Sequence, residues 1–399
     1  MKAKDAKGRL LAAVALLAAI ATAGMDALGI TATVQNKAQF LGAIAEASDG
    51  RGRLNQDLVV AFAADCAPMV VGETDLWNAS EKCLLDCGGH KIRLDAGGCP
   101  SGTVVFGDPD GERRGDRPVA IKGCGKGSVF KNLTLINHGR VEFDSVEDTL
   151  AKDCDFINCG TIAGLEAGGA IKGCGTVEGC GFDGCRARSG GALSGCGYVS
   201  ECVFLNCTAS YGGAIAGATD VFRCEFHGCN GGSVAANNGF GGAIYGGRDI
   251  VSCLFVDCLA RQGGAIMADG NGDGFHAKVV HCTFIRCRGE LNEEAVWESD
   301  EGSPVFMLNC LSYGCGLWLW QDGEEADEKY SCYRLVGTDF FRDVGVDHTV
   351  ADRVFASCHL ESVCREGVDL KINAVCHCFT DFAGQFITSC FFINRKPFF

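Results

Sequence analysis

Three ionisable side chains near the middle of the chain could carry out acid–base chemistry: Asp183, Glu225 and His227. Each stands directly beside the Phe of a repeated Cys-x-Phe-x-x-Cys motif. Paired carboxylates hydrolyse glycosidic bonds, and a carboxylate with a basic group can transfer protons. Equivalent positions in the other motif copies are mixed and often apolar. The motif therefore predicts no recurring catalytic constellation, and we expect a protein that is not an enzyme.

A second candidate is a metal site with oxygen ligands. Asp269, Asn271 and Asp273 alternate with glycine, as in the first half of a calcium-binding loop. The twelfth position is Val280, where such loops carry a bidentate Glu. A polar, glycine-rich insertion is the alternative interpretation. Ca²⁺ is the one cofactor for which the sequence offers ligands.

A third candidate is the segment Leu317-Trp318-Leu319-Trp320, which is apolar at every position. If it forms a strand, one pair of side chains points outward. Exposed aromatic rings stack on sugars or dock partners, so Trp318 and Trp320 are candidate binding residues. A strand edge packed under the acidic segment that follows is the alternative.

The elements that must position these residues come from an internal repeat. The tetrapeptide Gly-Gly-Ala-Ile/Leu begins at residues 168, 190, 212, 241 and 263, mostly 22 residues apart. It interleaves with seven Cys-x4-Cys copies, which begin at Cys154, Cys180, Cys202, Cys224, Cys253, Cys282 and Cys310. A 22-residue unit is too short for a helix pair, which takes about 33 residues or more. It fits one coil of a parallel β-helix with three short strands and three bends.

Bends are expected where residues tolerate a left-handed backbone. The residue before the second Cys of each motif is Gly, Asn or Asp in six of seven copies, Arg286 being the exception. The Gly-Gly pair marks another bend. Within Cys-x-Phe, the Cys and Phe share one face of a strand, which we expect to face the core.

The chain has 27 Cys, and their register predicts two internal columns. Equivalent residues on successive coils stand about 4.8 Å apart, slightly too far and wrongly aimed for a disulfide. We expect mostly free, buried thiols that act as small hydrophobic side chains. A few disulfides between coils, favoured by export, remain an alternative.

The interleaved tetrads resemble the repeats of the chlamydial polymorphic outer-membrane proteins, and more widely the right-handed parallel β-helices of the pectate-lyase-like type. Five Gly-Gly-Ala tetrads carry the resemblance, across roughly residues 150–290. The second tetrad departs from the family, because the third residue after each Phe is Cys and not Asn. The resemblance implies a surface-exposed or autotransporter-type adhesin. Activity does not follow from the fold alone.

The N-terminal region predicts export and a cap. A basic start, an apolar run from Leu10 and the small residues Ala21-Thr22-Ala23 predict a signal peptide over 1–23; an uncleaved anchor is the alternative. Residues 24–50 form a cap segment with an amphipathic helix over about 36–48. Asn36 and Gln39 favour its start, Gly50 favours its end, and Phe40, Leu41, Ile44 and Ala45 lie at helical spacing.

The sequence therefore predicts an all-β protein, a right-handed parallel β-helix over 51–399 behind a short N-terminal capping helix. Repeats are clearest over 150–315, and coils over 316–399 are degenerate.

A net charge of −15 argues against nucleic acid as a partner. We expect an exported adhesin or passenger-like module, extracellular or at a bacterial cell surface or outer membrane, without a transmembrane helix in the mature chain. A host surface, a glycan or an envelope component would be its partner. A polysaccharide lyase or glycoside hydrolase, and a structural spacer, are the alternatives.

Overall fold

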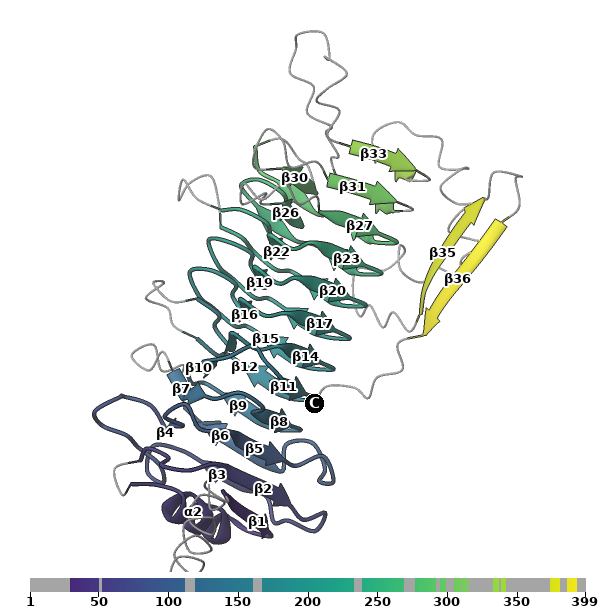
Figure 1. Cartoon of the computed structure of the whole chain (residues 1–399). Coiled ribbons are helices and arrows are strands. Elements are labelled where there is room, and N and C mark those ends of the chain that lie inside the picture. The colour runs from purple at the N-terminus through teal and green to yellow at the C-terminus, as the bar shows by residue number, and fades with distance from the viewer. Residues whose placement is uncertain are drawn as a thin grey trace, which may run out of the picture.

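Most of the described chain is a parallel β-helix, as the computed structural model in Figure 1 shows. The structure describes residues 29–49, 52–111, 119–160, 167–232, 239–268, 277–291, 295–298, 305–308, 310–313 and 315, and the strands at 333–336, 339–341, 374–380 and 386–392. The predicted signal peptide lies outside these residues. A complete coil contributes one strand to each of three parallel sheets, named here A, B and C in the order in which a coil visits them.

Sheet A has twelve strands in register order: β1 (Ile30–Val34), β2 (Leu58–Phe62), β5 (Ile92–Asp95), β8 (Val129–Lys131), β11 (Leu150–Lys152), β14 (Thr176–Glu178), β17 (Tyr198–Ser200), β20 (Asp220–Phe222), β23 (Asp249–Val251), β27 (Lys278–Val280), β31 (Val305–Leu308) and β33 (Tyr333–Val336).

Sheet B has eleven strands: β3 (Met69–Val71), β6 (Val104–Gly107), β9 (Thr134–Ile136), β12 (Asp155–Ile157), β15 (Gly181–Asp183), β18 (Val203–Leu205), β21 (Glu225–His227), β24 (Leu254–Val256), β28 (Thr283–Ile285), β32 (Leu311–Tyr313) and β34 (Asp339–Phe341).

Sheet C has nine strands: β4 (Leu85–Asp86), β7 (Val119–Cys124), β10 (Arg140–Phe143), β13 (Ile171–Lys172), β16 (Leu193–Ser194), β19 (Ile215–Ala216), β22 (Ile244–Tyr245), β26 (Ile266–Ala268) and β30 (Val296–Glu298). Two short strands in a bend, β25 (Leu259–Ala260) and β29 (Arg288–Gly289), also pair in parallel.

The core is built from columns of identical positions on successive coils. Six stacked rings fill the inner face of sheet B: Phe156, Phe182, Phe204, Phe226, Phe255 and Phe284, all 1 % exposed or less. Buried Val and Ile residues line sheets A and C opposite them. Because alternate strand residues face inward, this column confirms the inward face that the Cys-x-Phe spacing predicts.

The coils bend at the predicted positions and at one further position. The residue before the second Cys has a positive φ, for example 51° at Asn206 and 50° at Arg286. The first Gly of each tetrad is also left-handed, as at Gly212 with φ 63°. The residue before the first Cys bends in the same way, with φ 55° at Glu201 and 57° at Ser252. Glu, Ser, Arg and His at this position gave no sequence signal, because such residues rarely adopt a left-handed backbone.

The helix α2 (Lys37–Glu46) confirms the predicted cap and its start. Asn36 Oδ1 accepts a hydrogen bond from Gln39 N at 3.0 Å, and Gln39 Oε1 accepts one from Gln35 N at 2.7 Å. The helix ends at Glu46, with Ala47 and not Gly50 as its C-cap. Its buried face comprises Phe40, Ala43 and Ile44, whereas Ala45 is exposed.

The ends of the coiled region differ from the predicted boundaries. Strand β1 precedes α2 and pairs with β2, so the first coil begins before residue 51. Beyond Cys315, β33 and β34 still extend sheets A and B in parallel. Strands β35 (Ala374–Thr380) and β36 (Phe386–Phe392) instead pair antiparallel with each other, which is a hairpin and not a coil. In the described residues, no helix is long and apolar enough to cross a membrane.

Candidate binding surfaces on the coil exterior

The three acid–base candidates lie on the outer face of sheet B. Asp183 ends β15, while Glu225 and His227 begin and end β21, two coils further along. Glu225 Oε2 and His227 Nε2 are 3.3 Å apart, so these two residues form a pair. Both are half-buried.

Asp183 is not part of that pair. The register runs from Asp183 to Leu205 and then to His227, so a leucine stands between them. From strand geometry, the Cα atoms of Asp183 and Glu225 are about 12 Å apart, because two coil steps and two residues along the strand separate them. Desolvation by the flanking coils raises the pKa of the exposed Asp183 carboxyl.

Apolar side chains surround the Glu225–His227 pair. Its neighbours on the adjacent coils are Val203 and Leu205 on one side, and Leu254 and Val256 on the other. Leu254 and Val256 are buried although their positions face outward. The pair therefore stands alone on an apolar sheet face, with one carboxylate and one imidazole within reach of each other.

The other sequence candidates lie outside the described residues. These are the calcium ligands Asp269, Asn271 and Asp273, and the binding residues Trp318 and Trp320. Within the part of the chain that the structure describes, no three His, Cys, Asp or Glu side chains gather in a way that could hold a metal ion.

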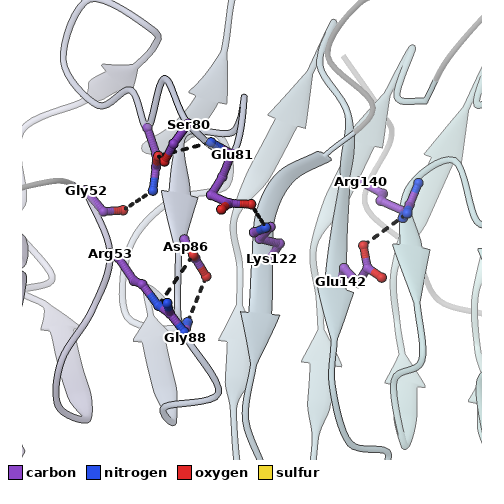
Figure 2. A network of polar contacts seen from close by, with 10 residues as sticks. Gly52, Arg53, Ser80, Glu81, Asp86, Gly88, Lys122, Arg140 and Glu142 are labelled. Atoms are coloured by element: carbon purple, nitrogen blue, oxygen red, sulfur yellow. Dashed lines mark hydrogen bonds and ion pairs between the residues drawn. The ribbon is translucent and has the colours of Figure 1, made fainter.

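The outer face of sheet C begins with alternating charges. Asp86, Lys122, Glu142 and Lys172 follow one another on successive coils, and Figure 2 shows the first three with their partners. Glu142 accepts hydrogen bonds from the buried Arg140 at 3.0 Å and from Lys172 at 2.7 Å. Desolvation alone would raise the pKa of Glu142, but these two cations outweigh it and lower that pKa. This half of the face is a set of ion pairs that neutralise one another.

Further along sheet C, the side chains in the same column are first small and then mostly aromatic. It continues through Ser194 and Ala216 to Tyr245, Met267 and Trp297. A neighbouring column in the bend adds Tyr211 and Phe240. We call Tyr211, Phe240, Tyr245, Met267 and Trp297 the aromatic patch.

Tyr211 contacts two other rings of the aromatic patch across coils. Tyr211 stacks on Phe240 with centroids 5.5 Å apart, and meets Tyr245 edge-on at 5.3 Å. All three, and Trp297, are half-exposed, while Met267 is buried among them. Half-exposed rings keep one face or edge open to solvent, and tyrosine adds a polar hydroxyl. The patch is therefore suited to binding a ligand that has both apolar and hydroxyl groups.

Sequence reasoning missed the aromatic patch, although a signal was present. Tyr211 and Phe240 stand directly before a Gly-Gly tetrad, where other copies carry Ala167, Ser189 and Gln262. Tyr245 follows its tetrad, where other copies carry Lys172, Ser194, Ala216 and Met267. Comparing these variable positions between copies would have placed the rings on two adjacent columns.

The two predicted Cys columns are present inside the solenoid. The 21 cysteines from Cys66 to Cys315 are all buried, and none of them is in a disulfide. In the columns the thiols donate to carbonyl oxygens: Cys180 Sγ lies 3.4 Å from Glu178 O and 3.6 Å from Ala151 O on the preceding coil. Burial raises the pKa of Cys202 well above its usual range. A protonated, buried thiol is a poor nucleophile, so these columns act as core.

No protein-family model matches the chain, and it has no significant similarity to a curated protein or to a solved structure.

Proposed function

We propose that the chain is an exported β-helix that acts as a binding module at a cell surface or after secretion, in the manner of an adhesin or passenger domain. The aromatic patch is its ligand site, and the ligand is a glycan of a host surface or a cell envelope. The single observation that carries this proposal is the contact of Tyr211 with both Phe240 and Tyr245 on a half-exposed face.

The chemistry of the patch favours a glycan. A sugar ring has an apolar C–H face bordered by hydroxyl groups, which suits an aromatic ring bordered by polar groups. Tyr211 and Tyr245 supply hydroxyls, and Gln262 follows Phe240 in the same column. Stacked coils hold these side chains on rigid strands and bends, so little side-chain entropy is lost on binding.

The test is binding of the purified full chain to immobilised glycans and to whole host cells. We expect saturable binding that falls at least tenfold in Tyr211→Ala and Tyr245→Ala. Tyr198→Ala is the matched control, because Tyr198 is also exposed and stacks on Phe222 at 5.2 Å, but on sheet A. Trp318→Ala and Trp320→Ala test the site expected from the sequence.

The outcomes separate the candidate sites. Loss of binding in the Tyr211 and Tyr245 variants, with retention in the Tyr198 variant, supports the aromatic patch. Loss of binding only in the Trp318 and Trp320 variants would place the ligand site in the segment that contains these two residues. Absence of binding to every glycan and cell type would contradict a binding module and favour a spacer.

A further inference from the structure

Two thiols in the early coils lie within contact distance of each other. The Sγ atoms of Cys87 and Cys124 are 3.7 Å apart, and both residues are fully buried. Cys87 follows β4, and Cys124 ends β7 on the next coil, so a bond between them would join neighbouring coils of sheet C. Neither residue belongs to the two Cys-x4-Cys columns.

A bulge explains why this pair differs from the columns. On β10, Val141 pairs with Ile121 of β7, and Phe143 pairs with Cys124 of β7. Between these two pairs, β7 has two residues whereas β10 has only Glu142. One of the two is Gly123, which has a φ of 68°. Such a bulge changes the direction of the next side chain.

The partner strand keeps its regular pairing opposite the bulge. Asp86 pairs with Lys122, and Cys87 N donates to Lys122 O at 2.8 Å. Cys124 is therefore one residue beyond the position that would match Cys87. In the columns, cysteines occupy matching positions on successive coils, whereas here the two cysteines are offset by one residue and their Sγ atoms are 3.7 Å apart.

Gly123 is required for this arrangement. A Cβ at Gly123 would stand 3.1 Å from Gly88 N and 3.2 Å from Asp86 Oδ1, on a backbone that L side chains rarely adopt. The backbone on both sides is fixed by hydrogen bonds, including Gly89 N to Gly123 O at 2.8 Å. The backbone that carries the two cysteines is thus held by the fold.

We propose that Cys87 and Cys124 are a modification site, at which a disulfide forms between two coils while the column thiols stay reduced. The oxidant is a small-molecule disulfide such as oxidised glutathione, or a dithiol–disulfide oxidoreductase. The thiolate of one cysteine attacks the oxidant's disulfide, forms a mixed disulfide and releases one thiol. The second cysteine's thiolate then attacks the protein sulfur of that mixed disulfide and releases the other thiol. Two protein thiols are oxidised, and one small disulfide is reduced to two thiols.

The bond would close the loop between residues 87 and 124. A cross-link of this length restricts the unfolded chain and therefore stabilises the fold. Because both thiols are buried, exchange is expected during folding and not in the finished structure. This inference goes beyond the proposed binding function and does not depend on it.

The experiment refolds the full chain in a glutathione redox buffer, then traps free thiols with N-ethylmaleimide in denaturant so that buried thiols also react. Peptides are mapped by mass spectrometry without reductant. We expect one linked peptide pair, containing Cys87 and Cys124, and N-ethylmaleimide on Cys180 and Cys202. Free Cys87 and Cys124 in refolded protein would overturn the proposal, and so would bridges between cysteines of the two columns. If the refolded chain does not regain the circular dichroism spectrum of the native protein, the same trapping is applied to chain purified under native conditions without reductant. Free Cys87 and Cys124, or bridges within the two columns, would again overturn the proposal.

Two variants give an independent measurement. In the wild type and in Cys180→Ala, the oxidised form should melt at a higher temperature than the form treated with a reductant. In Cys87→Ala, this difference should disappear. A difference that survives in Cys87→Ala, or is absent from the wild type, would show that the bond is elsewhere or does not form.

Discussion

The ring of Phe204 lies parallel to the ring of Phe226, with centroids 4.8 Å apart and an angle of 4° between the ring planes. This separation equals the distance between paired strands, about 4.8 Å, so each coil places its ring in van der Waals contact with the next. The six rings thus form one continuous column, in which each of the four inner rings is packed between two neighbours. Removing one ring affects two interfaces between coils.

Phe204→Ala should therefore lower the free energy of unfolding by about 3–5 kcal/mol, the cost of a large cavity at a fully buried ring. Phe222→Ala is the matched control. Phe222 is a half-buried residue on the outer face of sheet A, stacked only on Tyr198, and should cost about 1 kcal/mol. Denaturant unfolding followed by circular dichroism measures both. Equal effects would show that the column adds nothing to stability.

Gly213→Ala should destabilise the protein more than Gly217→Ala. A Cβ at Gly213 would overlap the carbonyl oxygen of Gly242 and the backbone of Asn230 on the next coil, so whole coils must shift. Gly217 has a φ of 67° but open space around it, so alanine there meets only backbone strain of about 1–2 kcal/mol. Melting temperatures of the two variants decide this. A smaller loss for Gly213→Ala would contradict the close coil packing.

Glu142→Gln should reduce stability at pH 7 by about 1–2 kcal/mol, because it removes a charge that pairs the buried Arg140. The pKa of Glu142 is lowered in the folded state, so its contribution is present above the unfolded value of about 4.3 and is lost as pH falls through the folded pKa. Wild type and variant should therefore converge as pH falls below the unfolded value and through the lowered folded pKa. Unfolding curves from pH 3 to 7 measure the difference.

Glu178→Gln serves as the control for this pH dependence. Glu178 pairs with Lys152 at 2.6 Å, but both side chains are more than a third exposed, so the effect should stay below about 1 kcal/mol. If the two Glu variants lose equal stability at pH 7, the burial of Arg140 does not strengthen its ion pair.

Polysaccharide depolymerisation tests the acid–base candidates. Because Leu205 separates Asp183 from His227, we expect no turnover of acidic polysaccharides, measured as new reducing ends or as ultraviolet absorbance of unsaturated products. Turnover that is abolished in Glu225→Gln and His227→Gln, and unchanged in the exposed control Glu201→Gln, would establish an enzyme instead.

The repeated part of this fold could be predicted from residues alone, and the reasons are local. Each Cys-x-Phe strand faces one way because side chains alternate, and Asn206 or Gly228 must bend the chain because few residues accept a positive φ. The start of α2 could also be predicted, because the side chains of Asn36 and Gln39 accept hydrogen bonds from backbone N–H groups three and four residues away. These features need no knowledge of distant neighbours.

What could not be predicted depends on contacts between coils of different length. The bulge at Gly123 has no motif of its own, and its effect on Cys124 appears only when β4 and β7 are paired. Tyr211 and Tyr245 are 34 positions apart in the chain, and their contact follows from a 29-residue coil between two tetrads. The hairpin β35–β36 has apolar runs with Cys like the coils, so composition did not distinguish an antiparallel pair from further repeats.

The in-register pairing of the coils also determines how far the molecule reaches. Each 22-residue unit adds about 4.8 Å along the stack and pairs with its neighbours through the same positions. Gain or loss of one whole unit between α2 and Tyr211 would move the aromatic patch by that step and leave its internal contacts as they are. The number of repeats therefore sets the position of the aromatic patch along the stack, and this position can change while the contacts within the patch stay the same.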